Sequence, residues 1–381
     1  VRSLLRPSEP SSEATERGSQ AEPIGGTRSH LMAGGRDLKS MAGGHALSAG
    51  LADDSVHTIF SAECNSIFDW HSIGLFESHR ASGMAGGITR LLACGADTLP
   101  SYRGLDIGPT FVHAPHLGLR PGEAYPAFNK PHSAALWVRA RQAGAQAGGP
   151  ALEAFVVFVD ADMLLTRPVR PSEFGVVPGT VAAATYDFLA GASQGLADAF
   201  GLFPKAHFAR VGGVHIFTFG DLADVAPRWL AWTEAVRGYA CDAPEAYSAL
   251  AMPDGARGAT AGAKLQFMWQ AEMYGYMIGA ADVGLQHASS RVLMQYSGYE
   301  PPPQADALQP PLLHYGVDWQ LGSAFSFNKL GHLHLRPSLC PRWFWPALPP
   351  NSVTVRCNAM QCSAVQCNAM QCNAVRCNAM Q

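Results

Sequence analysis

The sequence predicts an α/β protein with a mainly parallel central sheet, and three observations support this. Segments of β-branched and aromatic residues alternate along the chain with segments whose apolar residues recur at helical spacing. Residues 153–165, EAFVVFVDADMLL, form a nearly continuous apolar run, which is typical of a strand buried on both faces of a parallel sheet. The chain has 381 residues, 48% of them hydrophobic and 15% charged, which is enough to bury a substantial core.

The first elements follow from local patterns in chain order. Residues 56–63, VHTIFSAE, are mostly β-branched and aromatic and are expected to form the first strand. Residues 66–83 carry apolar side chains at helical spacing and are expected to form a helix that stops at its final glycine. A second strand is expected at 86–94, GGITRLLAC, and a second helix at 130–144, with Pro131 near its start.

The second half of the body continues this alternation. After the apolar strand at 153–165, another strand is expected at 179–189, GTVAAATYDFL, and helices are expected at 220–239 and 266–284. Ligands of such sheets bind beyond the carboxyl ends of the strands. The Asp-Ala-Asp sequence late in the apolar strand is therefore expected at the rim of a cleft.

Both ends of the chain differ from the middle, so three regions are expected. Residues 1–54 are rich in Gly, Ser, Arg and Ala with little periodicity and are interpreted as a disordered leader. Residues 55–350 are expected to form the folded domain. Residues 351–381 repeat Gln-Cys-Asn-Ala-Met with small changes, as a repeated CAATG unit would encode, and are interpreted as a disordered low-complexity tail. A metal-binding tail is the alternative, although cysteines five apart without histidine are unlike a zinc site.

Composition argues against several classes of partner. A net charge of -3 gives no electrostatic reason to expect nucleic acid or an anionic membrane surface. The sequence contains no run of ~18 apolar residues, so no membrane-spanning helix is expected. The first residues also lack the apolar core of a secretory signal. Five of the nine cysteines lie in the tail. The other four suit one or two disulfides or four thiols equally well: Cys64, Cys94, Cys241 and Cys340.

Asp160 and Asp162 are the clearest indication of chemistry, because two carboxylates in an apolar run need a positive partner. A calcium loop fits poorly, since it needs more oxygen ligands and a glycine at its turn. An aspartyl phosphotransferase also fits poorly, because Leu164 stands where Thr or Val is expected. A nucleotide-sugar glycosyltransferase fits, since its paired carboxylates hold a divalent metal against the donor's diphosphate. The alternative is a turn with two solvated aspartates.

Three basic or imidazole side chains are candidates for the same site. Neutral imidazole is a good ligand for manganese or zinc, so His314 in LLHYGVDW is expected to complete the metal site. Lys130 in YPAFNKP and Arg90 in GGITR are each expected to face a diphosphate or a uracil group. The alternatives are a hydrogen-bonded core histidine and two surface cations.

Two glycines and a carboxylate complete the candidate set. Gly212 and Gly213 permit close approach of the backbone to a sugar, or form a tight turn. Glu272 lies in an apolar, aromatic helix, where a carboxylate is more often functional or paired than idle. His332 and His334 could be a zinc pair, but no cysteine or carboxylate accompanies them, so a structural role is preferred.

A set of motifs occurs in order from Val56 to about Cys340: VHTIFSAECNSIFDWHSIGLFESHR, GGITRLLAC, YRGLDIGPTF, YPAFNKP, FVDADM, RVGGVHIFTFGDLADVAPRWL, EMYGYMIGAADVGLQH and LLHYG with FSFNKL. Together these motifs resemble the peptidyl-serine α-galactosyltransferases of plants and green algae, which are related to the hydroxyproline O-arabinosyltransferases. The arabinosyl branch carries a Pro-Asp-His type sequence where this chain has Asp-Ala-Asp, so the resemblance favours the galactosyl branch.

The resemblance implies a GT-A-like fold, UDP-galactose as donor, Mn²⁺ as metal, and serine of hydroxyproline-rich, extensin-type glycoproteins as acceptor. It also implies the lumen of the endoplasmic reticulum or Golgi, which would favour disulfides. By position, Asp160 and Asp162 match the family's metal motif, and His314 is inferred as the third ligand. The α-linkage formed from an α-linked donor implies retention, with Glu272 stabilising positive charge at the anomeric carbon.

The chain departs from the family pattern in two places. No acidic residue lies between Asp254 and Glu272, where the family carries an acidic segment, and AGAS replaces an expected Gly-Cys. Two alternatives to serine galactosylation therefore stay open. One is hydroxyproline O-arabinosylation, and the other is a non-catalytic glycan- or protein-binding domain of the same fold.

Overall fold

The computed structural model describes residues 55–121, 123–189, 195–196, 198–200, 208–251, 269–297, 309–321 and 325–333. The chain divides into a unit at Val1–Leu47, which lies outside these residues, and a compact unit at Ser48–Gln381. The predicted leader at 1–54 and tail at 351–381 also lie outside the described residues, as do His334, Cys340 and the segment that precedes Trp269.

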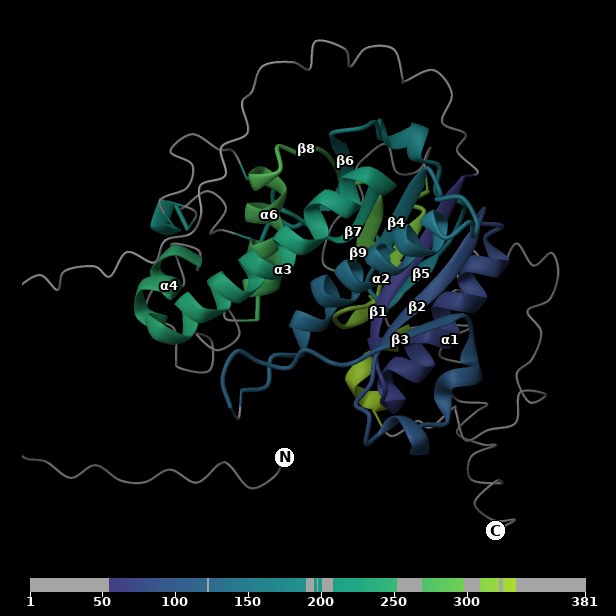
Figure 1. The fold of residues 1–381 in the computed structure, drawn as a ribbon, viewed down its shortest axis with the longest axis horizontal. Coiled ribbons are helices and arrows are strands. Elements are labelled where there is room, and N and C mark those ends of the chain that lie inside the picture. The colour runs from purple at the N-terminus through teal and green to yellow at the C-terminus, as the bar shows by residue number, and fades with distance from the viewer. Residues whose placement is uncertain are drawn as a thin grey trace, which may run out of the picture. The chain divides into compact units, whose positions relative to one another are not determined.

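A seven-stranded sheet forms the centre of the described fold, with the strand order β3-β2-β1-β4-β7-β6-β8 (Figure 1). Its strands are β1 (Val56–Glu63), β2 (Gly87–Ala93), β3 (Thr110–His113), β4 (Phe155–Val159), β6 (Thr180–Thr185), β7 (Val211–Thr218) and β8 (Gln286–Ser290). Only β7 runs antiparallel to its neighbours, β4 and β6, and the other pairs are parallel. The predicted α/β class with a mainly parallel central sheet is therefore confirmed.

The predicted helices are present with small shifts at their ends. They are α1 (Ser66–Ala81), α2 (Asn129–Gln146), α3 (Phe219–Asp242) and α6 (Ala271–Asp282), and a short helix α4 (Pro244–Ala251) follows α3. The Asn65 side chain accepts a hydrogen bond from the backbone N–H of Phe68 and so begins α1. Gly83, at φ +69°, lets the chain turn away after α1 because glycine adopts this conformation without strain.

The helices cover both faces of the sheet. Adjacent residues of β1 point to opposite faces: the Phe60 ring packs edge-on against Phe76 of α1, and the Ser61 hydroxyl bonds Ser133 of α2. On the α2 side, Phe158 of β4 contacts Trp229 of α3. Figure 1 shows α2 and α3 beside each other across the strands, and α6 packs against α3. One face of the sheet therefore carries α2, α3 and α6, and the other carries α1.

The prediction of one strand over residues 153–165 is wrong in an instructive way. β4 ends at Val159, and the chain leaves the central sheet through the two aspartates before β5 (Met163–Leu165) begins. β5 belongs to a separate small sheet with β10 (Leu312–His314) and β9 (Met294–Tyr296). Two buried strands in different sheets give the same unbroken apolar run as one long strand, so periodicity alone does not separate them.

A disulfide joins Cys64, directly after β1, to Cys94, directly after β2. Cys241 is a free thiol. The expectation of disulfides in the body is thus met by one pair, which links the ends of neighbouring parallel strands. No helix among the described residues has the length and apolar character that a membrane crossing requires.

The double variant Cys64→Ser/Cys94→Ser is expected to lose about 2–4 kcal/mol of unfolding free energy, because the crosslink closes a loop with a sequence separation of 30 residues. Urea unfolding of both proteins measures the difference. Cys241→Ser, which removes a thiol that makes no crosslink, serves as the control. A double variant as stable as the wild type would show that the crosslink contributes little to this fold.

Candidate functional site

A cavity of about 390 Å³ lies where β1 and β4 end. Its walls come from the end of β1, the first turns of α1, the start of α2, the Asp160–Asp162 turn, the start of α6 and Lys329. Polar and charged lining residues are Ser61, Glu63, His71, Asn129, Lys130, Asp160, Asp162, Glu272 and Lys329. This position beyond the carboxyl ends of parallel strands is the one that the sequence predicts.

Asp160 and Asp162 line this cavity, and His314 lies close to both of them without lining it. One ligand atom from each lies within 4.8 Å of the others. The strand pairing explains why: β10 runs antiparallel to β5, which sets His314 opposite Met163, and the Tyr315 backbone N–H donates to the Asp162 carbonyl at 3.1 Å. Two carboxylates and one imidazole form a donor set that fits a divalent cation such as Mn²⁺. The three residues predicted as metal ligands are therefore placed together.

Each of the two carboxylates has its own lysine. Lys130 Nζ lies 2.6 Å from Asp160 Oδ1, and Lys329 Nζ lies 2.5 Å from Asp162 Oδ2. Burial alone would raise the pKa of Asp162, but His314 and Lys329 hold it well below its ordinary range. Burial likewise opposes the charge of Lys130, but the nearby carboxylates outweigh it and raise the Lys130 pKa. Both aspartates thus have the positive partner that their apolar setting requires.

Glu272, in the first turn of α6, lies on the Lys130 side of the cavity. Its carboxylate Oε1 is 3.9 Å from Lys130 Nζ, and only 5% of the residue is exposed. The Tyr125 hydroxyl accepts a hydrogen bond from the Glu272 backbone N–H at 2.9 Å and donates to the Trp269 carbonyl at 2.6 Å, which fixes the helix start. Burial raises the pKa of Glu272 to about 7. Burial therefore favours the protonated form of this carboxyl group over the form that an exposed glutamate takes.

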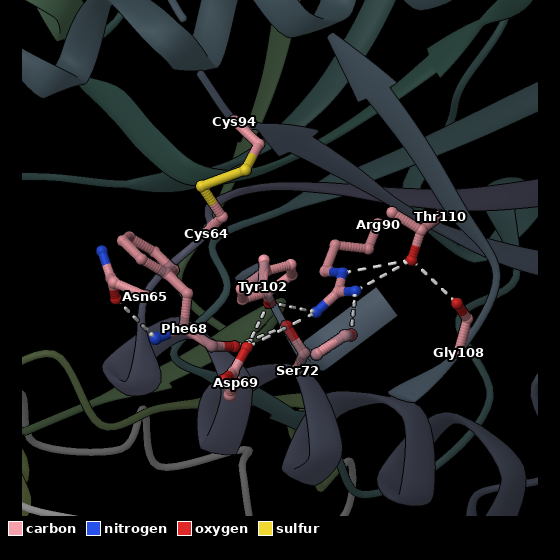
Figure 2. Close-up of polar contacts among 11 residues, drawn as sticks. Cys64, Asn65, Phe68, Asp69, Ser72, Arg90, Cys94, Tyr102, Gly108 and Thr110 are labelled. Carbon is pink, nitrogen blue, oxygen red and sulfur yellow. Dashed lines mark hydrogen bonds and ion pairs between the residues drawn. A yellow bond between two sulfur atoms is a disulfide. The ribbon is translucent and has the colours of Figure 1, made fainter. Parts of the chain in front are cut away.

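Arg90 is not part of the cavity wall. It is fully buried, and its guanidinium donates to the Gly104 carbonyl at 2.6 Å and to Thr110 Oγ1 at 3.0 Å (Figure 2). Asp69 of α1 lies 3.9 Å from the same guanidinium, and Tyr102 accepts from it at 3.3 Å. The structure thus places Arg90 in a buried network that joins α1, β2 and the segment before β3. It does not bring Arg90 to the cavity that Asp160 and Asp162 line.

Gly212 and Gly213 lie behind the site rather than in its wall. A Cβ on either residue would collide with the ring or hydroxyl of Tyr186, and Gly213 has φ +72°. The Gly213 carbonyl accepts from the Asp160 backbone N–H at 3.1 Å. The predicted approach to a sugar is not what these glycines provide, because they make room for Tyr186. That tyrosine in turn bonds His314 Nδ1 at 3.1 Å and leaves Nε2 facing Asp162.

Tyr186→Phe is expected to weaken Mn²⁺ binding about 10- to 100-fold, because the hydroxyl that orients the His314 ring is lost. Titration followed by the Mn²⁺ electron paramagnetic resonance signal measures the affinity. Tyr276→Phe is a matched control, since it removes another tyrosine–histidine bond, to His287 at 3.0 Å, and Tyr276 does not line the cavity. Equal affinities in the two variants would show that Tyr186 does not position the ligand.

The sequence did not single out five polar residues of the wall: Ser61, Glu63, His71, Asn129 and Lys329. Asn129 lies in the quoted motif YPAFNKP, next to the candidate cation Lys130, and Lys329 lies in the quoted motif FSFNKL. Glu63 ends β1, and Asn129 Nδ2 donates to its Oε1 at 3.1 Å. His71 sits on the apolar face of α1, where a histidine reads as a core residue. No local pattern distinguishes it.

Comparison with known proteins finds two relatives that carry the same name. No protein-family model matches the chain. A protein named peptidyl serine alpha-galactosyltransferase from Arabidopsis thaliana is 36% identical over 291 residues, covering 74% of this chain and 33% of the relative. One of the same name from Chlamydomonas reinhardtii is 29% identical over 311 residues, covering 76% of this chain and 37% of the relative. The chain thus spans about a third of the length of these relatives.

Solved glycosyltransferase structures show only distant likeness. The galactosyltransferase LgtC, solved with donor and acceptor sugar analogues, has a TM-score of 0.36 at 11% identity and covers 68% of this chain and 87% of its own. The bifunctional glycosyltransferase WbbM has a TM-score of 0.37 at 11% identity and covers 70% and 46%. These scores are too low to support a conclusion about the present site. On its sequence similarity, the chain is a homologue of these two proteins named peptidyl serine alpha-galactosyltransferase, over about three quarters of its own length.

Proposed function

We propose that this chain is a metal-dependent, retaining glycosyltransferase that moves galactose from UDP-galactose to serine in hydroxyproline-rich, extensin-type glycoproteins. The observation that carries the proposal is the cluster of Asp160, Asp162 and His314, whose two carboxylates line a cavity that Glu272 also lines. The names of the two relatives support galactose as the sugar and a peptidyl serine as the acceptor.

The cavity has the size and lining that a nucleotide sugar needs. Its volume of about 390 Å³ falls within the common range for small-molecule sites, about 300–1,000 Å³. Apolar side chains such as Ile67, Phe68 and Met273 share the wall with the charged groups. A ligand with a flat base, a sugar and a doubly charged linker matches this mixture of surfaces.

Asp160, Asp162 and His314 would hold the divalent metal, and Mn²⁺ suits their oxygen and nitrogen atoms. Such a metal supplies Lewis-acid neutralisation of the charge that develops on the departing diphosphate. Lys130 and Lys329 add positive charge on either side of the aspartates. Together with a bound divalent cation, these ammonium groups would offset the carboxylates of the wall and the negative charge of a leaving diphosphate.

A reaction that retains the configuration of the anomeric carbon gives Glu272 a role. The bond between the anomeric carbon and the phosphate oxygen breaks, the serine oxygen bonds to the same face of that carbon, and the serine proton passes to the departing phosphate. Positive charge on the sugar rises as the first bond breaks. A buried carboxylate at 3.9 Å from Lys130 stabilises that charge when it is ionised.

The compartment proposed for this reaction is the lumen of the endoplasmic reticulum or Golgi. Disulfides persist in oxidising compartments and are rare in the cytosol. The Cys64–Cys94 pair is consistent with that setting.

The test is a transfer assay with the full chain, Mn²⁺ and a serine–hydroxyproline peptide, offered UDP-galactose or UDP-arabinose in separate reactions. Mass spectrometry with side-chain assignment reads the product. We expect galactose on serine. Arabinose on hydroxyproline would instead identify an O-arabinosyltransferase. Neither transfer nor hydrolysis of either donor, by a chain that folds and binds Mn²⁺, would identify a non-catalytic glycan- or protein-binding domain.

A further inference from the structure

The two ends of the cavity differ in how well their lysines are neutralised. Lys130 Nζ has two carboxylates nearby, Asp160 at 2.6 Å and Glu272 at 3.9 Å. Among the described residues, Lys329 Nζ pairs with Asp162 alone, at 2.5 Å. An ammonium group has three N–H donors. The Lys329 end of the cavity therefore keeps more positive charge for an incoming anion than the Lys130 end.

His71 lies at this same end of the cavity and has unused hydrogen-bonding capacity. It lines the cavity, its charged neighbours are Asp162, Lys329 and His314, and only 3% of the residue is exposed. Neither of its ring nitrogens has a hydrogen-bond partner among the described residues. Burial lowers the pKa of His71 to about 3, so the ring is neutral and carries one N–H. Buried donors without partners are rare in folded proteins, so this one calls for an explanation.

The packing of α1 explains how the ring is held in place. Trp70, its neighbour on the helix, stacks on Tyr315 with ring centroids 5.9 Å apart and meets Phe327 edge-on. The His71 ring itself meets Tyr315 edge-on at 5.6 Å. This cluster joins α1 to the segment that carries Lys329, since Phe327 and Lys329 are two residues apart. The imidazole and the ammonium are therefore fixed relative to each other by a single apolar cluster.

We propose that His71 and Lys329 form the subsite for a phosphate oxygen of the nucleotide-sugar donor, so that the diphosphate lies at their end of the cavity and the sugar at the Glu272 end. This assignment rests on the function proposed above. An anionic oxygen here gains a charged donor from Lys329 and a neutral donor from His71. At the other end, Glu272 repels an anion and favours the carbon that becomes positive.

Calorimetric titration of the full chain with UDP in the presence of Mn²⁺ tests the subsite. His71→Phe keeps a ring of similar shape but removes both nitrogens, and Lys329→Met keeps the side-chain length but removes the charge. We expect each to weaken UDP binding about tenfold. Uridine, which has no phosphate, should bind all three proteins equally in ligand-observed nuclear magnetic resonance. Mn²⁺ alone should bind His71→Phe as it binds the wild type.

The control is His79→Phe, two turns further along α1, where a buried histidine has an unpaired Nε2 but does not line the cavity. His71→Asn, which keeps an N–H donor, should recover part of the lost affinity and also covers the case in which His71→Phe fails to fold. UDP affinity that is unchanged in His71→Phe and Lys329→Met would overturn the subsite and leave the proposed function intact. Equal losses for UDP and uridine would also overturn it. A wild-type chain that binds Mn²⁺ but not UDP would overturn both proposals.

Discussion

Replacing both aspartates, Asp160→Asn/Asp162→Asn, is expected to abolish tight Mn²⁺ binding and to lower UDP-galactose turnover by about 10³-fold or more. The change keeps the size of both side chains and removes the two carboxylates that meet His314 within 4.8 Å. One imidazole cannot hold a hard divalent cation alone, because such ions prefer several oxygen ligands. The loss should therefore appear in metal affinity first and in turnover as a consequence.

Two measurements separate this explanation from general damage. Electron paramagnetic resonance titration gives the Mn²⁺ affinity, and thermal unfolding shows whether the variant still folds. Asp242→Asn, which removes an exposed carboxylate paired with Arg120, is the control and should behave as the wild type. Chelation of the wild-type chain should abolish turnover, and added Mn²⁺ should restore it. Turnover by the double variant near the wild-type rate would refute a metal-dependent reaction at this site.

The double variant also leaves two lysines without their carboxylates. Lys130 is held charged by Asp160 and Glu272 against the effect of burial. With both aspartates neutral, Glu272 at 3.9 Å is the one carboxylate among the described residues that still raises the pKa of Lys130. Metal-free UDP should therefore bind the double variant at least as well as the wild type, since two repulsive carboxylates are gone. Loss of UDP affinity would mean that the aspartates support the fold of the cavity as well as the metal.

The central part of the site could be predicted from the sequence because it depends on local rules. Asp160 and Asp162 follow directly after a strand that is apolar throughout, and a parallel sheet places strand ends at its ligand-binding edge. Glu272 was recognisable as a carboxylate inside an apolar helix. In these cases a charged residue within an apolar segment was sufficient to indicate the site.

Arg90 and the two glycines show where such reasoning stops. Arg90 was interpreted as a ligand-facing cation within a strand, but the network that buries it comes from Asp69, Tyr102 and Gly104, and their proximity is set by tertiary packing. Gly212 and Gly213 have no Cβ because Tyr186, about 25 residues earlier, occupies that space. Contacts between distant segments leave no periodic trace in one sequence.

Glu272→Gln is expected to lower kcat by about 10²–10³-fold, because the amide occupies the same volume but cannot offer negative charge to the anomeric carbon. Wild-type kcat should fall as the pH drops below about 7, where Glu272 takes up a proton. The variant should lack that limb of the profile. Glu173→Gln, a surface change in an ion pair with Arg167, should keep both the rate and the profile. A Glu272→Gln enzyme with the wild-type profile would assign the titration to another group.

The same substitution should stabilise the folded chain at high pH. The pKa of Glu272 is about 7 in the fold against an ordinary value of 4.5, so the folded state binds the proton more tightly than the unfolded state. The contribution of this group to the free energy of unfolding is fully present below pH 4.5 and is lost as the pH rises through about 7. Glu272→Gln, which never ionises, should therefore match the wild type near pH 4.5 and exceed it by about 1–3 kcal/mol at pH 8.

Urea unfolding of both proteins at the two pH values measures this difference. A variant less stable than the wild type at pH 8 would mean that the ion pair with Lys130 outweighs the cost of burying the charge, and that Glu272 is retained for the fold. A more stable but slower variant has a different meaning. It would show that the chain keeps a costly buried carboxylate 3.9 Å from Lys130 because the reaction, rather than the fold, requires it.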